Sequence, residues 1–158
     1  MIYLGIDNGV SGSVGYIWGG VATYVKMPVN RVLNYTKSKQ WLHRIDGQEL
    51  SKLLKFSGED CYCMIERPMV NPGRWKATMS AMRAMEATLI VLELLKIPYQ
   101  FIDSKEWQKA LLPSGLEKEE LKTASRQVGT RLFPNMQWGD FKDADGLLIA
   151  EYNRRAHK

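Results

Sequence analysis

Alternating apolar and polar residues open the chain and predict three short strands. The first covers residues 2–6 and leads into Asp7, the second covers residues 14–18, and the third covers residues 21–27 before Pro28. Three glycines bring the chain round from the first run into the second: Gly9, Gly12 and Gly15. Connections this short join antiparallel neighbours, so the pattern predicts a three-stranded meander with a carboxylate at the end of its first strand.

The next segment, residues 31–44, is basic and aromatic and has no clear period. We therefore expect an irregular, solvated excursion there. Asp46 and Gly47 then begin a short helix, which is predicted to cover the sheet. Its apolar face consists of Leu50, Leu53 and Leu54.

The middle of the chain predicts a strand, a long helix and another strand. Residues 61–68 form an apolar run that ends on Glu66 and Pro68, residues 74–95 carry apolar side chains at every third or fourth position, and residues 99–102 are apolar again. Such a unit makes a right-handed crossover between parallel strands. The predicted fold class is therefore α/β, with a five-stranded mixed sheet of three antiparallel and two parallel strands flanked by helices.

Three helices are expected in the last third of the chain. Ser104 is predicted to cap a short one, residues 117–133 form an amphipathic one, and the last begins after Asp145. The middle helix has a basic outer face, which includes Lys118, Lys122, Arg126 and Arg131. An outer face of this kind either is simply solvated or binds a polyanion.

Composition narrows the class of protein. With 158 residues, 45% of them hydrophobic, the chain is long enough for one globular domain over residues 1–158. Its net charge of +5 favours a polyanionic partner. Cys61 and Cys63, two apart in an apolar run, are expected to be reduced core residues. No apolar run reaches the roughly 20 residues of a membrane span and no signal peptide is evident, so we expect a soluble, intracellular protein.

Acidic residues gather at three predicted element ends. Asp7 and Glu66 end strands, and Asp140, Asp143 and Asp145 precede the last helix. Each alone has an ordinary explanation as a turn or helix cap. Together they offer the oxygen ligands that Mg²⁺ prefers, and two such ions can activate a water and stabilise the leaving oxygen in phosphodiester hydrolysis. The sequence lacks the His-rich or Cys-rich set typical of zinc.

Four motifs in this order resemble the RuvC-like Holliday junction resolvases of the ribonuclease H-like superfamily, and most closely their phage-type members. They are G-I-D-N-G at residues 5–9, M-I-E-R-P at 64–68, I-D-S-K-E-W-Q-K-A-L at 102–111 and D-A-D-G-L-L-I-A-E-Y at 143–152. The resemblance spans almost the whole chain. It implies a ribonuclease H-like nuclease domain and crossover junction endodeoxyribonuclease activity, with Asp7, Glu66 and Asp145 as catalytic acids and Lys122 as an assisting cation.

The remaining acid departs from the family pattern. The family usually has two acids three or four residues apart on this helix. Here the residue three positions before Asp145 is Lys142, and the nearest acids are Asp143, two positions before, and Asp140, five positions before. Residues two apart on a helix project to different sides, so Asp143 can share a metal with Asp145 only from a non-helical position. We assign Asp143 as the fourth acid and keep Asp140 as the alternative. Residues 69–75 show no clear match to the family's junction wedge.

The resemblance further implies cofactor, partner and location. Asp7, Glu66, Asp143 and Asp145 are expected to bind two Mg²⁺ ions, with Mn²⁺ able to substitute, and the substrate is expected to be branched DNA such as a four-way junction. The expected location is the cytoplasm of a bacterium or phage-infected host. Paired cuts from one site per chain imply a homodimer, with Met79, Met82, Met85 and Met69 on or near the long helix as its candidate interface.

Two other interpretations stay open. The glycine-rich segment at residues 5–15 also resembles the phosphate loop of actin-like ATPases and sugar kinases, although these need a second lobe. A non-catalytic nucleic-acid-binding module would explain the charge and the aromatic residues Tyr35, Trp41, Trp75 and Trp138 but would leave the separated acids unexplained. An assay for nicking of a four-way junction with Mg²⁺, compared with an assay for nucleotide hydrolysis, distinguishes the resolvase, the ATPase or kinase, and the non-catalytic module.

Overall fold

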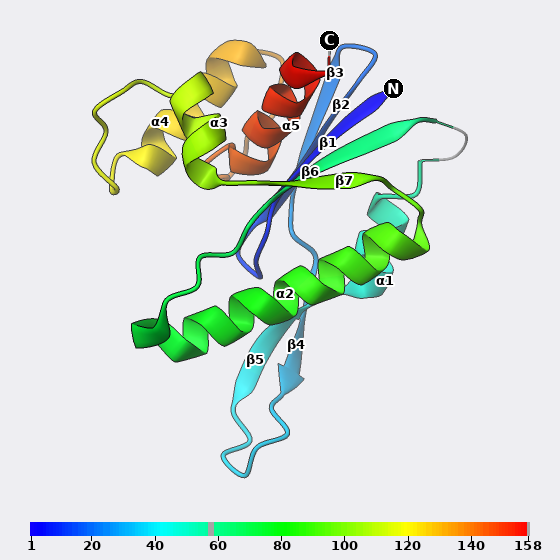
Figure 1. Cartoon of the computed structure of the whole chain (residues 1–158), viewed down its shortest axis with the longest axis vertical. Helices are drawn as coiled ribbons and strands as arrows, with labels where there is room; N and C mark the ends of the chain where they lie inside the picture. The colour runs from blue at the N-terminus through cyan, green and yellow to red at the C-terminus, as the bar shows by residue number, and fades with distance from the viewer. Residues whose placement is uncertain (57–58, 158) are drawn as a thin grey trace.

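Five strands form one mixed sheet in the computed structural model, which describes residues 1–56 and 59–157 (Figure 1). The strands lie in the order β3-β2-β1-β6-β7. β1, β2 and β3 are antiparallel neighbours, and β6 and β7 continue the sheet in parallel with β1. Their bounds are Ile2–Asp7, Ser13–Trp18, Val21–Lys26, Cys61–Glu66 and Tyr99–Ile102. The predicted sheet of three antiparallel and two parallel strands is confirmed.

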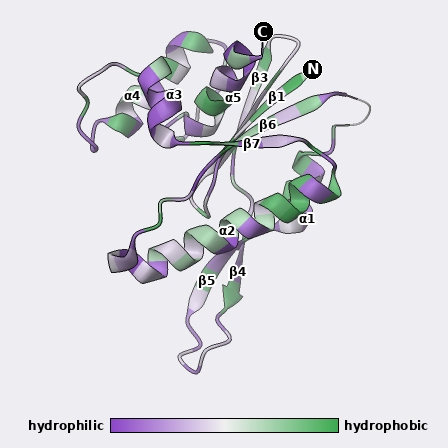
Figure 2. Cartoon of the chain, viewed as in Figure 1, coloured by the Kyte–Doolittle hydropathy of each residue, from purple (hydrophilic) through white to green (hydrophobic). Residues whose placement is uncertain are grey.

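Helices cover both faces of this sheet. One face carries α1 (Gly47–Leu53) and α2 (Trp75–Leu94), which follows the short 3₁₀ helix η1 (Pro72–Arg74). The other face carries α3 (Ser104–Leu111), α4 (Leu121–Leu132) and α5 (Asp145–Ala156) (Figure 1). Along α2, the hydrophobic positions concentrate toward the C-terminal half (Figure 2). Each face of the sheet therefore has its own core.

The alternation along β1 and β6 sets the direction of the acids. Leu4, Ile6 and Ile65 are buried in the core beneath α1 and α2. Because successive side chains of a strand point to opposite faces, Asp7 and Glu66 project to the α5 face. Ile6 pairs with Ile65 in the parallel ladder, so the two acids lie next to each other at the carboxyl ends of adjacent strands.

Two glycines let α5 lie directly on the sheet. Gly5 and Gly15 are partners in the β1–β2 ladder. A Cβ at Gly5 would come 2.2 Å from Ala150 N, and one at Gly15 would come 2.4 Å from Leu147 Cα. Gly15 was expected to help the chain turn, but it lies inside β2, where its missing side chain admits the helix backbone. Asn153 fixes the same helix by donating to Leu4 O at 2.9 Å and Tyr62 O at 2.8 Å.

The basic segment after β3 forms a hairpin, so the prediction of an irregular excursion at residues 31–44 is wrong. β4 (Val29–Leu33) pairs with β5 (Trp41–Ile45) as a separate two-stranded sheet. Most of its residues are exposed on both faces, so no apolar alternation marks it in the sequence. In Figure 1 the hairpin extends away from the main sheet beyond α2.

Helix boundaries differ from the predictions at two places. Asp103, rather than Ser104, is the N-cap of α3, and its backbone N–H donates to Glu106 Oε1 at 3.3 Å. α4 begins at Leu121, since residues 117–120 form a turn. The predicted cap of α1 is confirmed, because Asp46 Oδ1 accepts hydrogen bonds from the first turn.

Two smaller expectations can be compared with the fold. Cys61 and Cys63 are free thiols, and Cys63 is fully buried, as expected for core residues. Over residues 1–56 and 59–157, no helix is both long and apolar enough to cross a membrane.

Candidate active site

Four carboxylates lie in one region of the molecule, where β1, β6 and α5 meet. Asp7 ends β1 and Glu66 ends β6, while Asp143 and Asp145 precede and begin α5. Burial raises the pKa of Asp7 well above its ordinary value, and the negative charges of Asp145, Glu66 and Asp143 raise it further. Asp7 is therefore the centre of a compact negative cluster.

Asp145 is held by a serine of the neighbouring helix. The Ser125 hydroxyl donates to Asp145 Oδ1, and Ser125 Oγ accepts from Ala144 N at 3.0 Å. Burial and the charge of Asp143 raise the pKa of Asp145 to about 7, although the Ser125 hydrogen bond opposes the shift. Ser125 thus connects α4 to the start of α5 and fixes the position of this acid.

Asp143 is tied to the sheet through Tyr24. The Tyr24 hydroxyl donates to Asp143 Oδ1 at 2.9 Å and is also hydrogen-bonded to Ser13 Oγ at 3.0 Å. Ser13 Oγ accepts in turn from Gly146 N at 3.1 Å. Burial raises the pKa of Tyr24, so the phenol remains a donor at neutral pH. Since Asp143 precedes the N-cap Ala144, it occupies the non-helical position that sharing an ion with Asp145 requires.

Glu66 is oriented by a buried indole. Trp107, on α3, donates from Nε1 to Glu66 Oε2 at 2.7 Å, and its side chain is 1% exposed. Burial raises the pKa of Glu66, while the hydrogen bond from Trp107 opposes that rise. The indole therefore favours the ionised carboxylate.

Lys122 is the cation beside the acids. From the second position of α4, its Nζ lies 3.3 Å from Asp143 Oδ2. Partial burial works against the charged form, but Asp143, Asp145 and Asp7 raise the pKa of Lys122 above its ordinary value. Lys122 is thus a fixed positive charge at the rim of the cluster.

Asp140 lies apart from the other acids. It is exposed and pairs with Lys26 Nζ at 2.7 Å, and this hydrogen bond lowers its pKa. The main charges that raise the pKa of Asp7 include Asp143 and do not include Asp140. Of the two candidates for the fourth acid, the one near Asp7 is Asp143.

The donor set suits a hard cation, although the side chains face their own neighbours. All four acids offer only carboxylate oxygens, the ligands of Mg²⁺. Lys122 offsets part of the negative charge around Asp7. A bound cation would offset more of it. In the described part of the chain, no three acidic, histidine or cysteine side chains already meet around a single point. Glu66 faces Trp107, Asp145 faces Ser125, and Asp143 faces Tyr24.

The residues that orient the acids were not identified as such from the sequence. Trp107 belongs to the motif at residues 102–111 and Tyr24 to the third predicted strand, and neither was given a role at the site. Ser125 follows Lys122 by one helical turn, and that spacing is a signal for a shared face. For the Trp107–Glu66 and Tyr24–Asp143 pairs, the partners are 41 and 119 residues apart, so no local pattern connects them.

Comparison with solved structures identifies the architecture. The chain is similar to Thermus thermophilus RuvC in complex with a Holliday junction substrate, with a TM-score of 0.63 and 13% identity over 99% of this chain and 96% of that chain. A second Thermus thermophilus RuvC structure matches with a TM-score of 0.56 and 14% identity, covering 99% of this chain and 97% of the other. Comparisons with protein-family models and with curated protein sequences give no match. The chain therefore has the ribonuclease H-like fold seen in RuvC, with its mixed five-stranded sheet and flanking helices.

Proposed function

We propose that this chain is a Mg²⁺-dependent, structure-selective endonuclease that resolves Holliday junctions by paired phosphodiester hydrolysis. The observation that carries the proposal is the half-buried Asp7 beside Glu66, Asp143 and Asp145, whose pKa is raised by its loss of solvent and by these three charges. Buried like charges are costly, so they are retained where a ligand compensates them. The match to a RuvC that binds a Holliday junction supports the choice of substrate.

Asp7, Glu66, Asp143 and Asp145 are the residues that would hold two Mg²⁺ ions. When bound, such ions supply an activated water and stabilise charge on the phosphate and leaving oxygen. Asp7 is the acid whose pKa is raised by the charges of all three others. Trp107 and Ser125 would keep Glu66 and Asp145 oriented toward the cluster.

Lys122 would act on the substrate directly. Its exposed ammonium lies at the rim of the acids, where a scissile phosphate would approach. A fixed positive charge there stabilises the extra negative charge of the pentacoordinate phosphate. In the free protein Asp143 holds this ammonium in place.

The decisive experiment is cleavage of an end-labelled four-way junction with Mg²⁺, with ATP hydrolysis measured on the same preparation. We expect paired nicks in opposite strands and no nucleotide hydrolysis. Asp7→Asn should abolish cleavage yet still bind the junction in a mobility-shift assay. Full activity of Asp7→Asn would refute the metal assignment, and ATP hydrolysis without nicking would favour an actin-like ATPase.

We also propose that the working unit is a two-fold homodimer, because one chain carries acids for one site and resolution needs two symmetric cuts. Met82 on α2 is 45% exposed, and Met79 and the loop residue Met69 are exposed as well. Met85 was expected at this interface but is only 5% exposed, since it packs in the core between the sheet and helices α1 and α2. Sedimentation at micromolar concentration should give a dimer. A strict monomer that still makes paired cuts would contradict it.

A further inference from the structure

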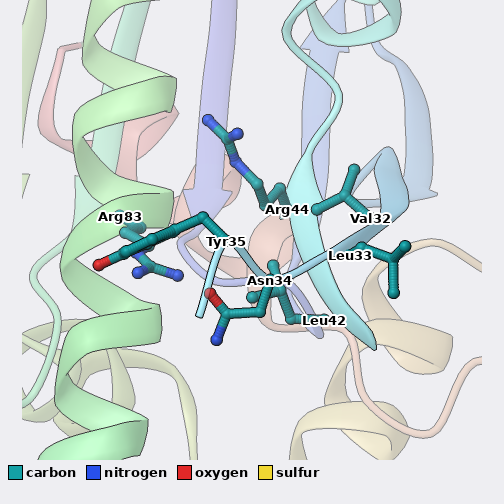
Figure 3. Close-up of a pocket in the computed structure, with 7 residues that line it drawn as sticks. All are labelled: Val32, Leu33, Asn34, Tyr35, Leu42, Arg44 and Arg83. Atoms are coloured by element: carbon teal, nitrogen blue, oxygen red, sulfur yellow. The ribbon is translucent and has the colours of Figure 1, made fainter. Parts of the chain in front are cut away.

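A groove runs between the β4–β5 hairpin and helix α2. It encloses about 800 Å³ and is lined by Tyr35 and Arg44 from the hairpin and by Trp75, Lys76 and Arg83 from α2. Figure 3 shows the hollow that adjoins it, which shares three of these residues, Tyr35, Arg44 and Arg83. The hairpin and the helix therefore form two walls of one open channel.

The charges of the groove suit a polyanion. Arg44, Arg83 and Lys76 line it, whereas Glu86 is the single acid among its described lining residues. Over residues 1–56 and 59–157, none of the three cations is paired with a carboxylate. Unpaired cations that face the same space attract phosphate groups and release counterions on binding.

Exposed rings indicate that the polyanion is an unpaired strand. Tyr35 is 90% exposed and Trp75 is 66% exposed, and both line the groove. Bases within a duplex are stacked on each other and are closed to side-chain rings, whereas bases of a single strand can stack on them. A channel with cations and aromatic rings is the usual design of a single-strand site.

The groove also reaches the turn that connects β1 to β2. Val10 lines it and lies in the turn that follows Asp7. The same turn touches α2, because Asn8 Nδ2 donates to Ala81 O at 3.4 Å and Asn8 Oδ1 accepts from Thr88 Oγ1 at 3.3 Å. A strand lying in the groove would therefore pass close to the turn that follows Asp7.

A second copy of the chain is a less suitable occupant of the cationic part of the groove, although the homodimer proposed above uses the α2 face that carries Met79. A two-fold contact places the same surface patch against itself, so Arg44, Arg83 and Lys76 would meet their own equivalents. Like charges brought together in an interface are unfavourable. The exposed apolar residues Met79 and Ile90 at the groove would favour such a contact, and for this reason the test includes it.

We infer that the groove between the β4–β5 hairpin and α2 binds a single DNA strand that is unpaired at the branch point of the substrate. Arg44, Arg83 and Lys76 contact its phosphates, and Tyr35 and Trp75 stack on its bases. The role at a branch point rests on the proposed function. Binding of a single strand by the groove can be tested without cleavage.

The test measures binding of a fluorescent oligothymidine of about 15 nucleotides to the full chain in EDTA, by anisotropy over a series of salt concentrations. Arg44→Gln/Arg83→Gln should weaken binding about tenfold or more and reduce the salt slope by roughly 1.4, since each phosphate contact on a single strand contributes about 0.7. Tyr35→Ala should weaken binding about fivefold to a hundredfold, whereas Tyr35→Phe should bind like the wild type because the ring is kept.

Lys55→Gln/Lys96→Gln is the matched control. It removes the same charge at the opposite end of α2, where both lysines line a different hollow. If this control and Arg44→Gln/Arg83→Gln lose affinity equally, the groove is not the site. If the arginine variant changes the sedimentation coefficient while strand binding is unchanged, a second copy fills the groove and the inference is overturned.

Junction cleavage separates this inference from the proposed function. Wild-type cleavage with no effect of the groove variants on strand binding refutes the groove alone. Weakened strand binding in those variants, with no wild-type cleavage under any condition, supports the groove as a strand site and refutes the nuclease.

Discussion

The indole nitrogen of Trp107 lies 2.7 Å from Oε2 of Glu66, so a buried ring of α3 sets the direction of a carboxylate at the end of β6. The bond favours the ionised acid against the effect of burial. Partners of this kind orient metal ligands, and their loss is typically costly to metal affinity or activity.

Trp107→Phe should therefore lower cleavage about tenfold to a hundredfold at neutral pH. It should also move the acidic limb of the pH–rate profile to higher pH, because Glu66 loses the donor that lowers its pKa. Trp138→Phe is a matched control, since Trp138 is buried but its Nε1 has no hydrogen-bond partner among the described residues. Equal pH profiles for the two variants would show that the indole serves packing alone.

Lys122→Ala should slow turnover by about tenfold to a thousandfold while binding of the junction changes little. The reason is that the ammonium lies beside Asp143, at the rim of the acids, rather than on a remote surface. Single-turnover cleavage and mobility shift measure the two effects separately. Lys118→Ala, before the start of α4, removes an equal charge and should affect mainly salt-dependent binding. If both variants lose only affinity, Lys122 is a plain phosphate contact.

The metal-free protein should become less stable as the pH rises from about 4 toward 8. The pKa of Asp145 is about 7 in the fold against an ordinary value of 3.8, so between these values the folded state binds the extra proton. The stability that this proton contributes is fully present below the pKa of the unfolded state, 3.8. It is lost as the pH rises through the pKa of the folded state, about 7. The pKa of Asp7 is raised in the same direction.

Urea unfolding in EDTA at pH 5 and pH 8 measures this dependence. Asp145→Asn should flatten it and stabilise the protein at pH 8 by on the order of 1 kcal/mol or more. Adding Mg²⁺ at pH 8 should stabilise the wild type more than this variant. Asp140→Asn should show no such gain, because Asp140 is exposed and its pKa is lowered by Lys26. An unchanged pH dependence in Asp145→Asn would contradict the assignment.

Gly15→Ala should destabilise the fold by about 1–3 kcal/mol or more and reduce cleavage. The new Cβ would lie 2.4 Å from Leu147 Cα, so α5 would have to move away from β2 and carry Asp145 with it. Gly47→Ala is the control, since its Cβ would meet nothing closer than Val91 Cγ2 at 3.8 Å. Urea unfolding gives both values, and equal stability of the two variants would show that α5 is not held against the sheet at Gly15.

The sheet and the acids could be predicted because local patterns encode them. Alternation marks β1 and a continuous apolar run marks β6, and Asp7 and Glu66 each stand at the end of one of these runs. The hairpin at β4 and β5 was missed because both of its faces are exposed, which removes the alternation. Its basic and aromatic residues were noticed, but only the structure sets them opposite α2.

The neighbours of the acids could not be predicted for a different reason. Trp107 and Tyr24 donate hydrogen bonds to residues that are far away in the sequence. The spacing of apolar residues predicts the helix or strand to which a residue belongs, but not its partner in another element. The close approach of α5 to the glycines was hidden as well, since a glycine inside a strand looks like a turn residue until its partner is known.

The position of α5 across β1 also sets the order of events during synthesis. Asp7 and Glu66 leave the ribosome well before Asp143 and Asp145 are translated, and only the last helix covers the glycine-bearing face of the first two strands. Contacts between distant parts of a chain form late in folding. A nascent chain therefore holds two of the four acids and exposes an uncovered sheet face, so the proposed site cannot be complete before α5 has docked.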